Sequence, residues 1–332
     1  HAPPRYVVIR GGQHMVKVPL RPFRQLLLSI HAHLNRHDPD LIVTRWGDTW
    51  LFPHLLEGCR ERGVTFFNLN RDRKRQPLQR KENSYFTYGQ VVYRGRQIHL
   101  FGRWHIDQGN AVMDGEYGLP GVLEQARVTG LPVQEMARKS PGAGVTGMQM
   151  QTALRMGVMV PHLKQQAEHF KTVQELIRAD RGGLVYQPLT GLHYNVAEVD
   201  FVSMYPGLMV NFNLSPETVG VHSEDGRQIP ELDIPVDISQ EGLVPLTLRP
   251  LLAKRLMIKE QLARLDERDC RYKPFKSRAA GLKWLLVVCF GYLGYKNARF
   301  GRIEAHEAVT AYSRDVLLSA KEAAEDLNYT VL

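Results

Sequence analysis

The sequence predicts a multidomain protein in which an α/β part is followed by α+β parts. The chain has 332 residues, a length typical of two or three domains, and 43% of them are hydrophobic, enough to bury a sizeable core. From Arg5 to about Leu100, apolar runs of strand length alternate with amphipathic runs of helix length. From Pro250 onward, long helical patterns replace this alternation.

The elements of the first part follow from the spacing of apolar residues and from turn residues between them. We expect buried strands at Tyr6–Ile9 and Asp40–Val43 and helices over 21–35 and 50–62. A β-rich run is expected over 64–69, and a hairpin around Arg94-Gly95-Arg96 over 90–100.

The second part has mostly helical patterns, and its helices are interrupted by glycine, proline and a few strand-like runs. We expect a mostly helical stretch over 101–180, a strand pair formed by 182–186 and 193–200, and a turn-rich stretch over 220–244. Three long helices are expected over 250–268, 274–290 and 304–328, and the start of a buried strand over 329–332.

The charge balance is basic, with 43 Lys and Arg against 34 Asp and Glu and a net charge of +9. Such an excess is common in proteins that bind nucleic acid, because cations that neutralise phosphates release counterions, although an ordinary basic enzyme surface would also account for it. Cys59, Cys270 and Cys289 show no metal-ligand spacing, which disfavours a zinc module or a disulfide scaffold and favours a cytoplasmic setting. No apolar run approaches the roughly 20 residues that span a bilayer.

Asp200 is the first candidate for chemistry. It closes an alternating apolar run and precedes a helix-like run, Ser203 to Met209. A carboxylate at a strand end can hold a metal ion, and N–H groups at a helix start can face phosphate. An Asp that only caps the helix is the plain alternative. Two short segments around Asp200 carry a recognisable pattern of residue types at set spacing. They are Asp200-Phe201-Val202-Ser203-Met204-Tyr205-Pro206 and Asn213-Leu214-Ser215-Pro216-Glu217-Thr218.

This run resembles motif A of family B DNA polymerases. The resemblance implies that Asp200 binds both catalytic Mg²⁺ ions and that Phe201 offers its backbone carbonyl to one of them. It also implies nucleotide contacts from Ser203, Met204 and Tyr205, with the Tyr205 ring under the sugar, where it excludes a 2′-hydroxyl. Two metals stabilise the charge that develops in nucleotidyl transfer, and one Asp cannot hold two dications, so further carboxylates are required.

Basic residues on the next two predicted helices extend the resemblance. Arg255 and Lys259 are four residues apart and share a helix face. Their spacing resembles the fingers helix of the family, whose Arg and Lys touch the incoming triphosphate; a solvated basic face is the alternative. Arg278 and Lys283 resemble motif B and are implied to bind the nucleotide as well. Val287 stands where the family has an Asn, and an apolar side chain there cannot make its hydrogen bond.

The N-terminal part resembles a proofreading exonuclease around its second motif, through residues 38–43, Gly47-Asp48 and 53–57. In that motif Trp46 stands at the Asn position and Leu51 at the Asp position. Because Leu cannot bind a metal ion, we expect an RNase H-like, exonuclease-type fold without exonuclease chemistry.

The resemblance predicts the domain organisation. A degenerate exonuclease-like domain with a linker is expected over 1–180, the first part of the palm over 181–244, fingers helices over 245–292 and a continuation of the palm over 293–332. In the family, a strand that begins like 329–332 leads into motif C, Asp-Thr-Asp. We therefore expect the second metal-binding carboxylate and the thumb beyond residue 332, or on a second polypeptide.

The sequence thus predicts a DNA-directed DNA polymerase, similar to the divergent second-paralogue group of family B, without proofreading and incomplete in these 332 residues. Mg²⁺, deoxynucleoside triphosphates and primer–template DNA are the implied cofactor and partners, in a cytoplasmic, nucleoid-associated setting without a membrane. The alternative is a non-catalytic, nucleic-acid-binding subunit on a polymerase scaffold, which Val287 favours.

Overall fold

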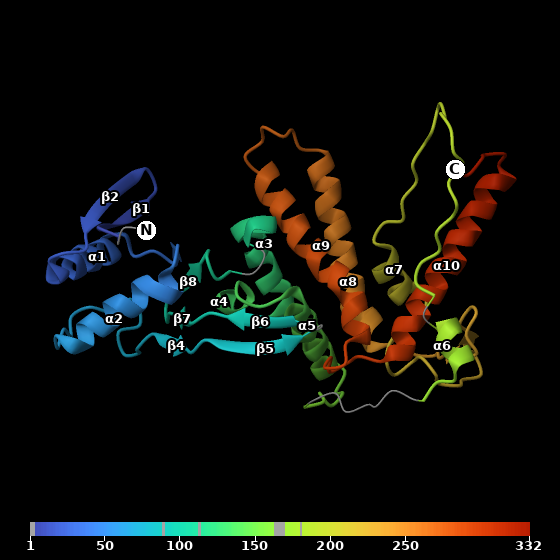
Figure 1. Ribbon diagram of the computed structural model, residues 1–332, viewed down its shortest axis with the longest axis horizontal. Coiled ribbons are helices and arrows are strands. Elements are labelled where there is room, and N and C mark those ends of the chain that lie inside the picture. Colours follow the sequence, from blue (N-terminus) through green and yellow to red (C-terminus); the bar gives the residue numbers. More distant parts are fainter. Residues whose placement is uncertain (1–3, 88–89, 112–113, 163–169, 180) are drawn as a thin grey trace. The chain divides into compact units, whose positions relative to one another are not determined.

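A computed structural model describes residues 4–87, 90–111, 114–162, 170–179 and 181–332, and the chain forms two compact units (Figure 1). Unit 1 comprises residues 1–114 and 133–138, and unit 2 comprises residues 115–132 and 139–332. Both helices and strands are present, so the mixed α/β class predicted from the sequence is confirmed. The predicted boundaries at 180, 244 and 292 stay a prediction.

Unit 1 has short two-stranded sheets and two main helices. β1 pairs with β2 and β5 with β6 in antiparallel fashion, β4 pairs with β7 likewise, and β3 pairs with β8 in parallel. The elements are β1 (Tyr6–Gly11), β2 (His14–Pro19), α1 (Phe23–His37), β3 (Leu41–Thr44), a π-helical turn η1 (Gly47–Leu51), α2 (Phe52–Glu61), β4 (Leu78–Arg80), β5 (Asn83–Thr87), β6 (Gln90–Arg94), β7 (Gln97–His99), β8 (Trp104–Asp107) and α4 (Val133–Met136).

The core of unit 1 forms where α1 and α2 bury one face each. Leu26, Leu27 and Ile30 follow helical spacing on α1, and they cluster with Phe52 and Leu55 of α2. Burying a side chain of this size contributes roughly 1.5–3 kcal/mol. The two predicted helices are therefore confirmed, and their apolar stripes explain why they form.

Three expectations for unit 1 are wrong. The two strands expected to be buried are present, but Tyr6 of β1 is 50% exposed and Val43 of β3 is 48% exposed, because each strand pairs with one other strand. Residues 64–69 form no strand. Arg94-Gly95-Arg96 does not turn a hairpin, since it joins β6 to β7 and these pair with β5 and β4 instead of with each other.

Unit 2 is mainly helical. Its elements are α3 (Asp114–Thr129, which begins at the last residue of unit 1), α5 (Pro141–Arg155), α6 (Val173–Ala179), α7 (Met204–Asn211), β9 (Arg227–Gln228), β10 (Pro235–Val236), α8 (Leu243–Ala263), α9 (Tyr272–Gly294) and α10 (Ile303–Asp326). In Figure 1, α8 and α9 run side by side as a long helical hairpin, and the described residues between them form its tip.

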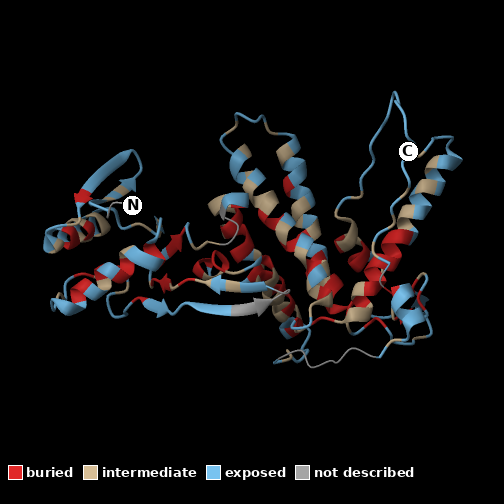
Figure 2. Cartoon of the chain, viewed as in Figure 1, coloured by how far each residue is buried: buried red, intermediate tan, exposed pale blue. Residues whose placement is uncertain are grey.

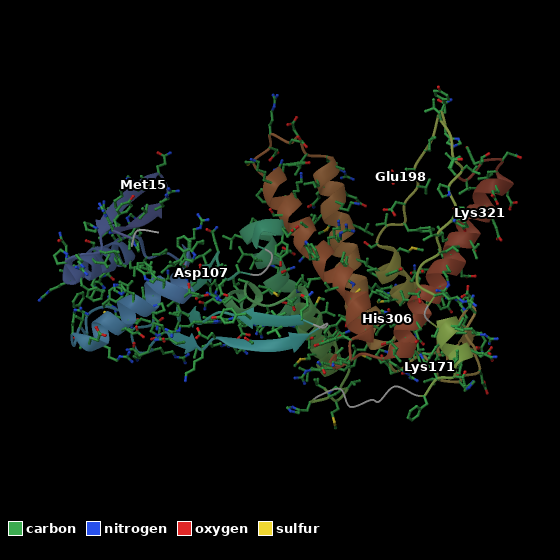
Figure 3. The ribbon with its side chains drawn as sticks, viewed as in Figure 1. Met15, Asp107, Lys171, Glu198, His306 and Lys321 are labelled. Carbon is green, nitrogen blue, oxygen red and sulfur yellow. The ribbon has the colours of Figure 1, made fainter. Side chains whose placement is uncertain are left out.

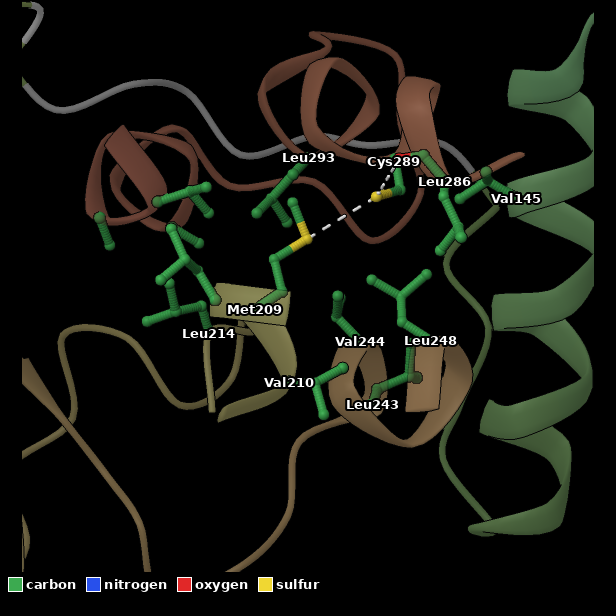
Figure 4. Packing of buried hydrophobic residues seen from close by; sticks show 14 of the residues in the cluster. Val145, Met209, Val210, Leu214, Leu243, Val244, Leu248, Leu286, Cys289 and Leu293 are labelled. Atoms are coloured by element: carbon green, nitrogen blue, oxygen red, sulfur yellow. Dashed lines mark hydrogen bonds between the residues drawn. The ribbon is translucent and has the colours of Figure 1, made fainter. Parts of the chain in front are cut away.

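The core of unit 2 lies where α5, α7, α8, α9 and α10 meet, and Figure 2 shows the buried faces of these helices. In Figure 4, Met209 of α7 reaches Cys289 of α9, with 3.9 Å between the two sulfur atoms. Burial raises the pKa of Cys289 to about 12, so this thiol packs as an apolar group and is not a nucleophile. The core therefore holds α7, which follows Asp200, against the helical hairpin.

The start of α8 corrects one expectation and explains another. Pro250 was expected in the first helical turn, but α8 begins seven residues earlier, at Leu243. The N–H of Leu243 donates to the Glu217 carboxylate, and the N–H of Val244 donates to Ser215 Oγ at 3.1 Å. Side-chain acceptors for these free N–H groups favour a helix start at this point. The end of the motif A run thus caps the helix that carries Arg255.

The predicted strand pair is wrong, because 182–186 and 193–200 form an exposed, extended stretch without strand pairing. Val185 is 89% exposed and Val199 is 93% exposed. A strand needs a neighbouring strand to pair its backbone N–H and C=O groups, and in the described part of the chain no strand lies beside this stretch. For the same reason residues 329–332 form no strand. Within the described ranges, none of the helices has the length and apolar composition needed to cross a bilayer.

Candidate functional site

A direct hydrogen bond connects α7 to α8 next to Asp200. Ser203 precedes α7 in the left-handed conformation, with φ 55°, which is uncommon for a residue with a side chain. Arg255 Nη1 donates to Ser203 Oγ at 2.8 Å. The structure therefore brings together two residues that the sequence placed in one site, although they are 52 positions apart.

Arg255 still has donor capacity. The residue is half-buried, and its Nε is a buried atom for which the described residues provide no acceptor. Burial lowers the pKa of Arg255, although a guanidinium stays protonated at any ordinary pH. Among the described residues, Arg255 therefore has an unused hydrogen-bond donor beside Ser203.

Asp200 and Phe201 lie in the exposed stretch before α7, which also contains the labelled Glu198 (Figure 3). Asp200 is exposed, and Phe201 is partly exposed. Among the described residues, no group of three or more His, Cys, Asp or Glu side chains lies close enough together to share a metal ion. One carboxylate does not make a two-metal centre, so these residues alone do not fit the Mg²⁺ pair that the sequence predicts.

Tyr205 belongs to a row of three rings from three helices. Its ring centroid is 4.6 Å from that of Phe290 on α9, and the Phe290 ring stacks at 4.0 Å on His306 of α10, which Figure 3 labels. The Phe290 carbonyl lies 3.1 Å from His306 Nδ1, which fixes the imidazole. Met204 packs against the core beside Tyr205. The row keeps Tyr205 on the hairpin side of α7 with part of its ring exposed.

The four basic candidates of the helical hairpin are in three different environments. Arg255 contacts Ser203, as described above. Lys259 and Lys283 are exposed, and neither has an ion-pair partner among the described residues. Arg278 is partly buried, and its Nε donates to Glu124 Oε2 at 2.9 Å. The structure does not gather all four residues around one point, but it keeps two lysines available to an anion.

Glu124 of α3 was not predicted from the sequence. It is 3% exposed, and it pairs with Lys254 of α8 as well as with Arg278 of α9. Burial by itself would raise the pKa of Glu124, but the two cations hold it below its ordinary value. Its hydrogen bond to Arg278 spans 154 positions, and no sequence pattern marks a contact of that range.

Trp46 and Leu51, which the sequence analysis assigned to a lost exonuclease centre, take part in the structure of unit 1. Trp46 is 59% exposed in a left-handed conformation, and its N–H donates to Asp107 Oδ1 at 2.9 Å. Leu51 packs against the core of unit 1. Neither side chain can ligate a metal ion.

Asp48, the carboxylate next to these positions, is saturated by protein donors. Arg138 donates to both of its oxygens, at 2.8 Å from Nε and 3.0 Å from Nη2. Asn110 and the N–H of Ile98 donate to Asp48 as well, at 2.9 and 2.8 Å. Burial by itself would raise the pKa of Asp48, but the Arg138 guanidinium holds it below the ordinary value. A buried guanidinium therefore provides the positive charge that faces this carboxylate, and no lone pair is left for a metal ion.

The comparison with known families settles the relationship. Residues 132–331 match the family model described as DNA polymerase family B, which covers more than half of the chain. This chain belongs to DNA polymerase family B. The family match contains α5 and the whole of α7 to α10, which carry or adjoin the candidate site.

Several archaeal polymerases are similar to this family B chain. DNA polymerase 2 of Saccharolobus solfataricus is 32% identical over 212 residues, which cover 64% of this chain and 31% of that protein. A DNA polymerase of Archaeoglobus fulgidus is 30% identical over 239 residues, or 72% of this chain and 29% of that protein. The chain spans less than half the length of these relatives.

A solved structure is similar over nearly the whole chain. The family B DNA polymerase from the hyperthermophilic archaeon Pyrobaculum calidifontis matches 95% of this chain with a TM-score of 0.64 and 23% sequence identity, and the match covers 46% of that polymerase. At this identity, the similarity establishes a shared fold.

Proposed function

We propose that this chain is the motif A and fingers portion of a DNA-directed DNA polymerase that extends a primer and lacks proofreading. The hydrogen bond from Arg255 to Ser203 carries the proposal, since it joins a basic residue of α8 to the residues that directly follow Asp200. Family membership supports the same reaction class, nucleotidyl transfer.

The proposed roles follow from charge and position. Asp200 is a metal ligand together with the Phe201 carbonyl, while Ser203, Met204 and Tyr205 line the nucleotide. Cations stabilise a triphosphate and the charge that develops on it during transfer. In this proposal Arg255, Lys259, Arg278 and Lys283 provide these cations on one helical hairpin.

The proposed activity requires metal-binding carboxylates in addition to Asp200. Two Mg²⁺ ions need carboxylates from more than one segment, and the described residues hold no group of three or more His, Cys, Asp or Glu side chains that could bind a metal ion. Polypeptide outside residues 1–332, in the same protein or in a second one that carries motif C and the thumb, would have to supply the rest. We expect no primer extension from residues 1–332 alone. Primer–template DNA and deoxynucleoside triphosphates are the proposed partners, at the nucleoid in the cytoplasm.

The proposed absence of proofreading depends on unit 1. Leu51 and Trp46 offer no metal ligand, and Arg138 already neutralises Asp48. Hydrolysis of a primer end requires a metal centre of several carboxylates in this class of nuclease. Unit 1 is therefore proposed to be a scaffold.

A non-catalytic, DNA-binding subunit is the second candidate. Val287 favours it, because this side chain is 55% exposed on α9 at the position where the family has a hydrogen-bonding Asn. The two proposals differ in one measurement, primer extension by the complete polymerase. The variant Asp200→Asn tests it, and Glu198→Gln is the matched control, since Glu198 is an exposed carboxylate two residues earlier in the same stretch. Loss of extension for Asp200→Asn alone supports the enzyme.

A further inference from the structure

Arg278 is held from two sides by residues that the family resemblance does not assign. Glu124 accepts a hydrogen bond from Arg278 Nε at 2.9 Å, and the Phe275 ring lies 5.1 Å from the guanidinium carbon. A guanidinium has five N–H donors, and this contact uses only the one on Nε. Across the described residues, no acceptor is found for the two terminal NH₂ groups. These groups form the planar fork that matches a phosphate.

Glu124 itself is firmly placed. It is 3% exposed, and its other oxygen pairs with Lys254 of α8. The second cation matters, because an unpaired buried carboxylate would repel a phosphate that approaches Arg278. With Lys254 present, the cluster of one carboxylate and two cations keeps a net positive charge.

The backbone around Arg278 is fixed against the helix that carries Glu124. A Cβ added at Gly281 would lie 2.9 Å from the Gly121 carbonyl oxygen, so only glycine permits the close approach of α3 to α9. Gln125 Nε2 donates to the Gly281 carbonyl at 2.9 Å. The position of Glu124 relative to Arg278 is therefore set by helix packing and does not depend on two flexible side chains alone.

We propose that Glu124 is a positioning residue, which holds Arg278 through Nε and turns its two terminal NH₂ groups toward a phosphate group. The proposal deepens the proposed function, since it rests on Arg278 as a ligand of the incoming triphosphate. It also explains why an acidic residue is buried beside a site for an anion. Loss of Glu124 leaves Arg278 charged but free to rotate, and the fork loses its preset direction.

Two explanations of Glu124 predict opposite changes in anion affinity when its charge is removed. If Glu124 were only a nearby charge, its neutralisation would strengthen anion binding, because a repulsive carboxylate would be gone. If Glu124 orients Arg278, its neutralisation weakens binding although the net charge becomes more positive. Inorganic tripolyphosphate is a suitable probe, since it presents the phosphate chain without base, sugar or primer.

The test is isothermal titration of the 332-residue chain with tripolyphosphate at low salt. We expect Glu124→Gln and Arg278→Gln each to weaken binding by about tenfold, the size of one lost charge-assisted hydrogen bond. The double variant should bind no more weakly than Arg278→Gln alone, because Glu124 acts through Arg278. The matched control is Arg127→Gln, which removes an exposed cation whose Nη1 is 3.8 Å from the same carboxylate, and it should retain at least half the affinity.

A second variant addresses the folding of Glu124→Gln. Phe275→Leu keeps Glu124 and its ion pairs with Lys254 and Arg278 but removes the ring beside the guanidinium, and it should weaken binding by about threefold. Unchanged or tighter binding by both Glu124→Gln and Phe275→Leu, together with weaker binding by Arg278→Gln, would overturn the positioning role and leave the proposed function intact. Unchanged binding by Arg278→Gln would overturn both, because Arg278 would then not be a phosphate ligand.

Discussion

Arg138 donates to both carboxylate oxygens of Asp48, and this ion pair is buried, with Asp48 at 0% and Arg138 at 2% exposure. The pair lies beside Trp46 and Leu51, at the place where the sequence predicted a lost metal centre. The Arg138 guanidinium balances the charge of Asp48, and the pair ties residues 133–138 to the rest of unit 1.

Replacing Arg138 should destabilise unit 1. Arg138→Met leaves Asp48 buried and uncompensated, and we expect a loss of about 3–5 kcal/mol in the free energy of unfolding. The double variant Asp48→Leu with Arg138→Met should recover much of this loss, because no buried charge remains. Urea unfolding followed by circular dichroism measures both. Equal stability of Arg138→Met and the wild type would contradict the stabilising role of the Asp48–Arg138 ion pair.

Two buried histidines predict a pH dependence of unit 1. Burial lowers the pKa of His99 and of His105 to about 4, from an ordinary value of 6.5. Between these values the unfolded chain binds more protons than the folded chain, so stability falls as pH decreases from about 6.5 to about 4. Thermal unfolding of wild type and His99→Gln over this range tests the prediction, and the variant should show a smaller loss. Burial also raises the pKa of Asp107, which acts in the opposite direction at the acidic end, so the difference between the two proteins is the decisive quantity.

The cap of α8 predicts a modest effect on stability. Ser215→Ala removes the acceptor of the Val244 N–H, and we expect a loss of about 1 kcal/mol. Ser140→Ala is the control, since Ser140 directly precedes α5 at its N-terminus but makes no side-chain hydrogen bond to that helix. A loss of similar size in both variants would argue against the capping role of the motif A run.

Val287 offers a gain-of-function prediction that rests on the proposed function. The side chain is 55% exposed, so Val287→Asn should change the free energy of unfolding by less than about 0.5 kcal/mol. An amide at this position restores hydrogen-bonding capacity near the nucleotide, and we expect a lower KM for deoxynucleotides with a similar kcat. Steady-state primer extension by the complete polymerase measures both constants. A raised KM would show that Val287 contributes through packing.

Sequence patterns predicted the long helices well, because periodic apolar stripes such as Leu26, Leu27 and Ile30 are a local property of the chain. They failed for residues 182–186 and 193–200, where the apolar pattern indicates strands but pairing depends on a partner elsewhere. The pattern also placed Pro250 at a helix start, since the true cap comes from Ser215 and Glu217, more than 25 positions earlier.

Only part of the candidate site could be predicted from the sequence. Ser203 and Arg255 followed from motif spacing, and the structure brings them together. Glu124 and Arg138 could not be found, because their partners lie 154 and 90 positions away and no periodicity connects them. Buried ion pairs of this range are a property of the folded chain and not of any local pattern.

The central claim is that Asp200 is a catalytic metal ligand of a DNA polymerase. Primer extension with Mg²⁺ and deoxynucleotides, by this chain together with the motif C and thumb polypeptide that the proposed function requires, tests it most directly. Asp200→Asn should reduce the rate by at least about 10²-fold, as expected for a group that acts on the transition state, while Glu198→Gln retains near wild-type activity and both variants bind primer–template DNA normally. Equal extension by Asp200→Asn and the wild type would contradict the claim.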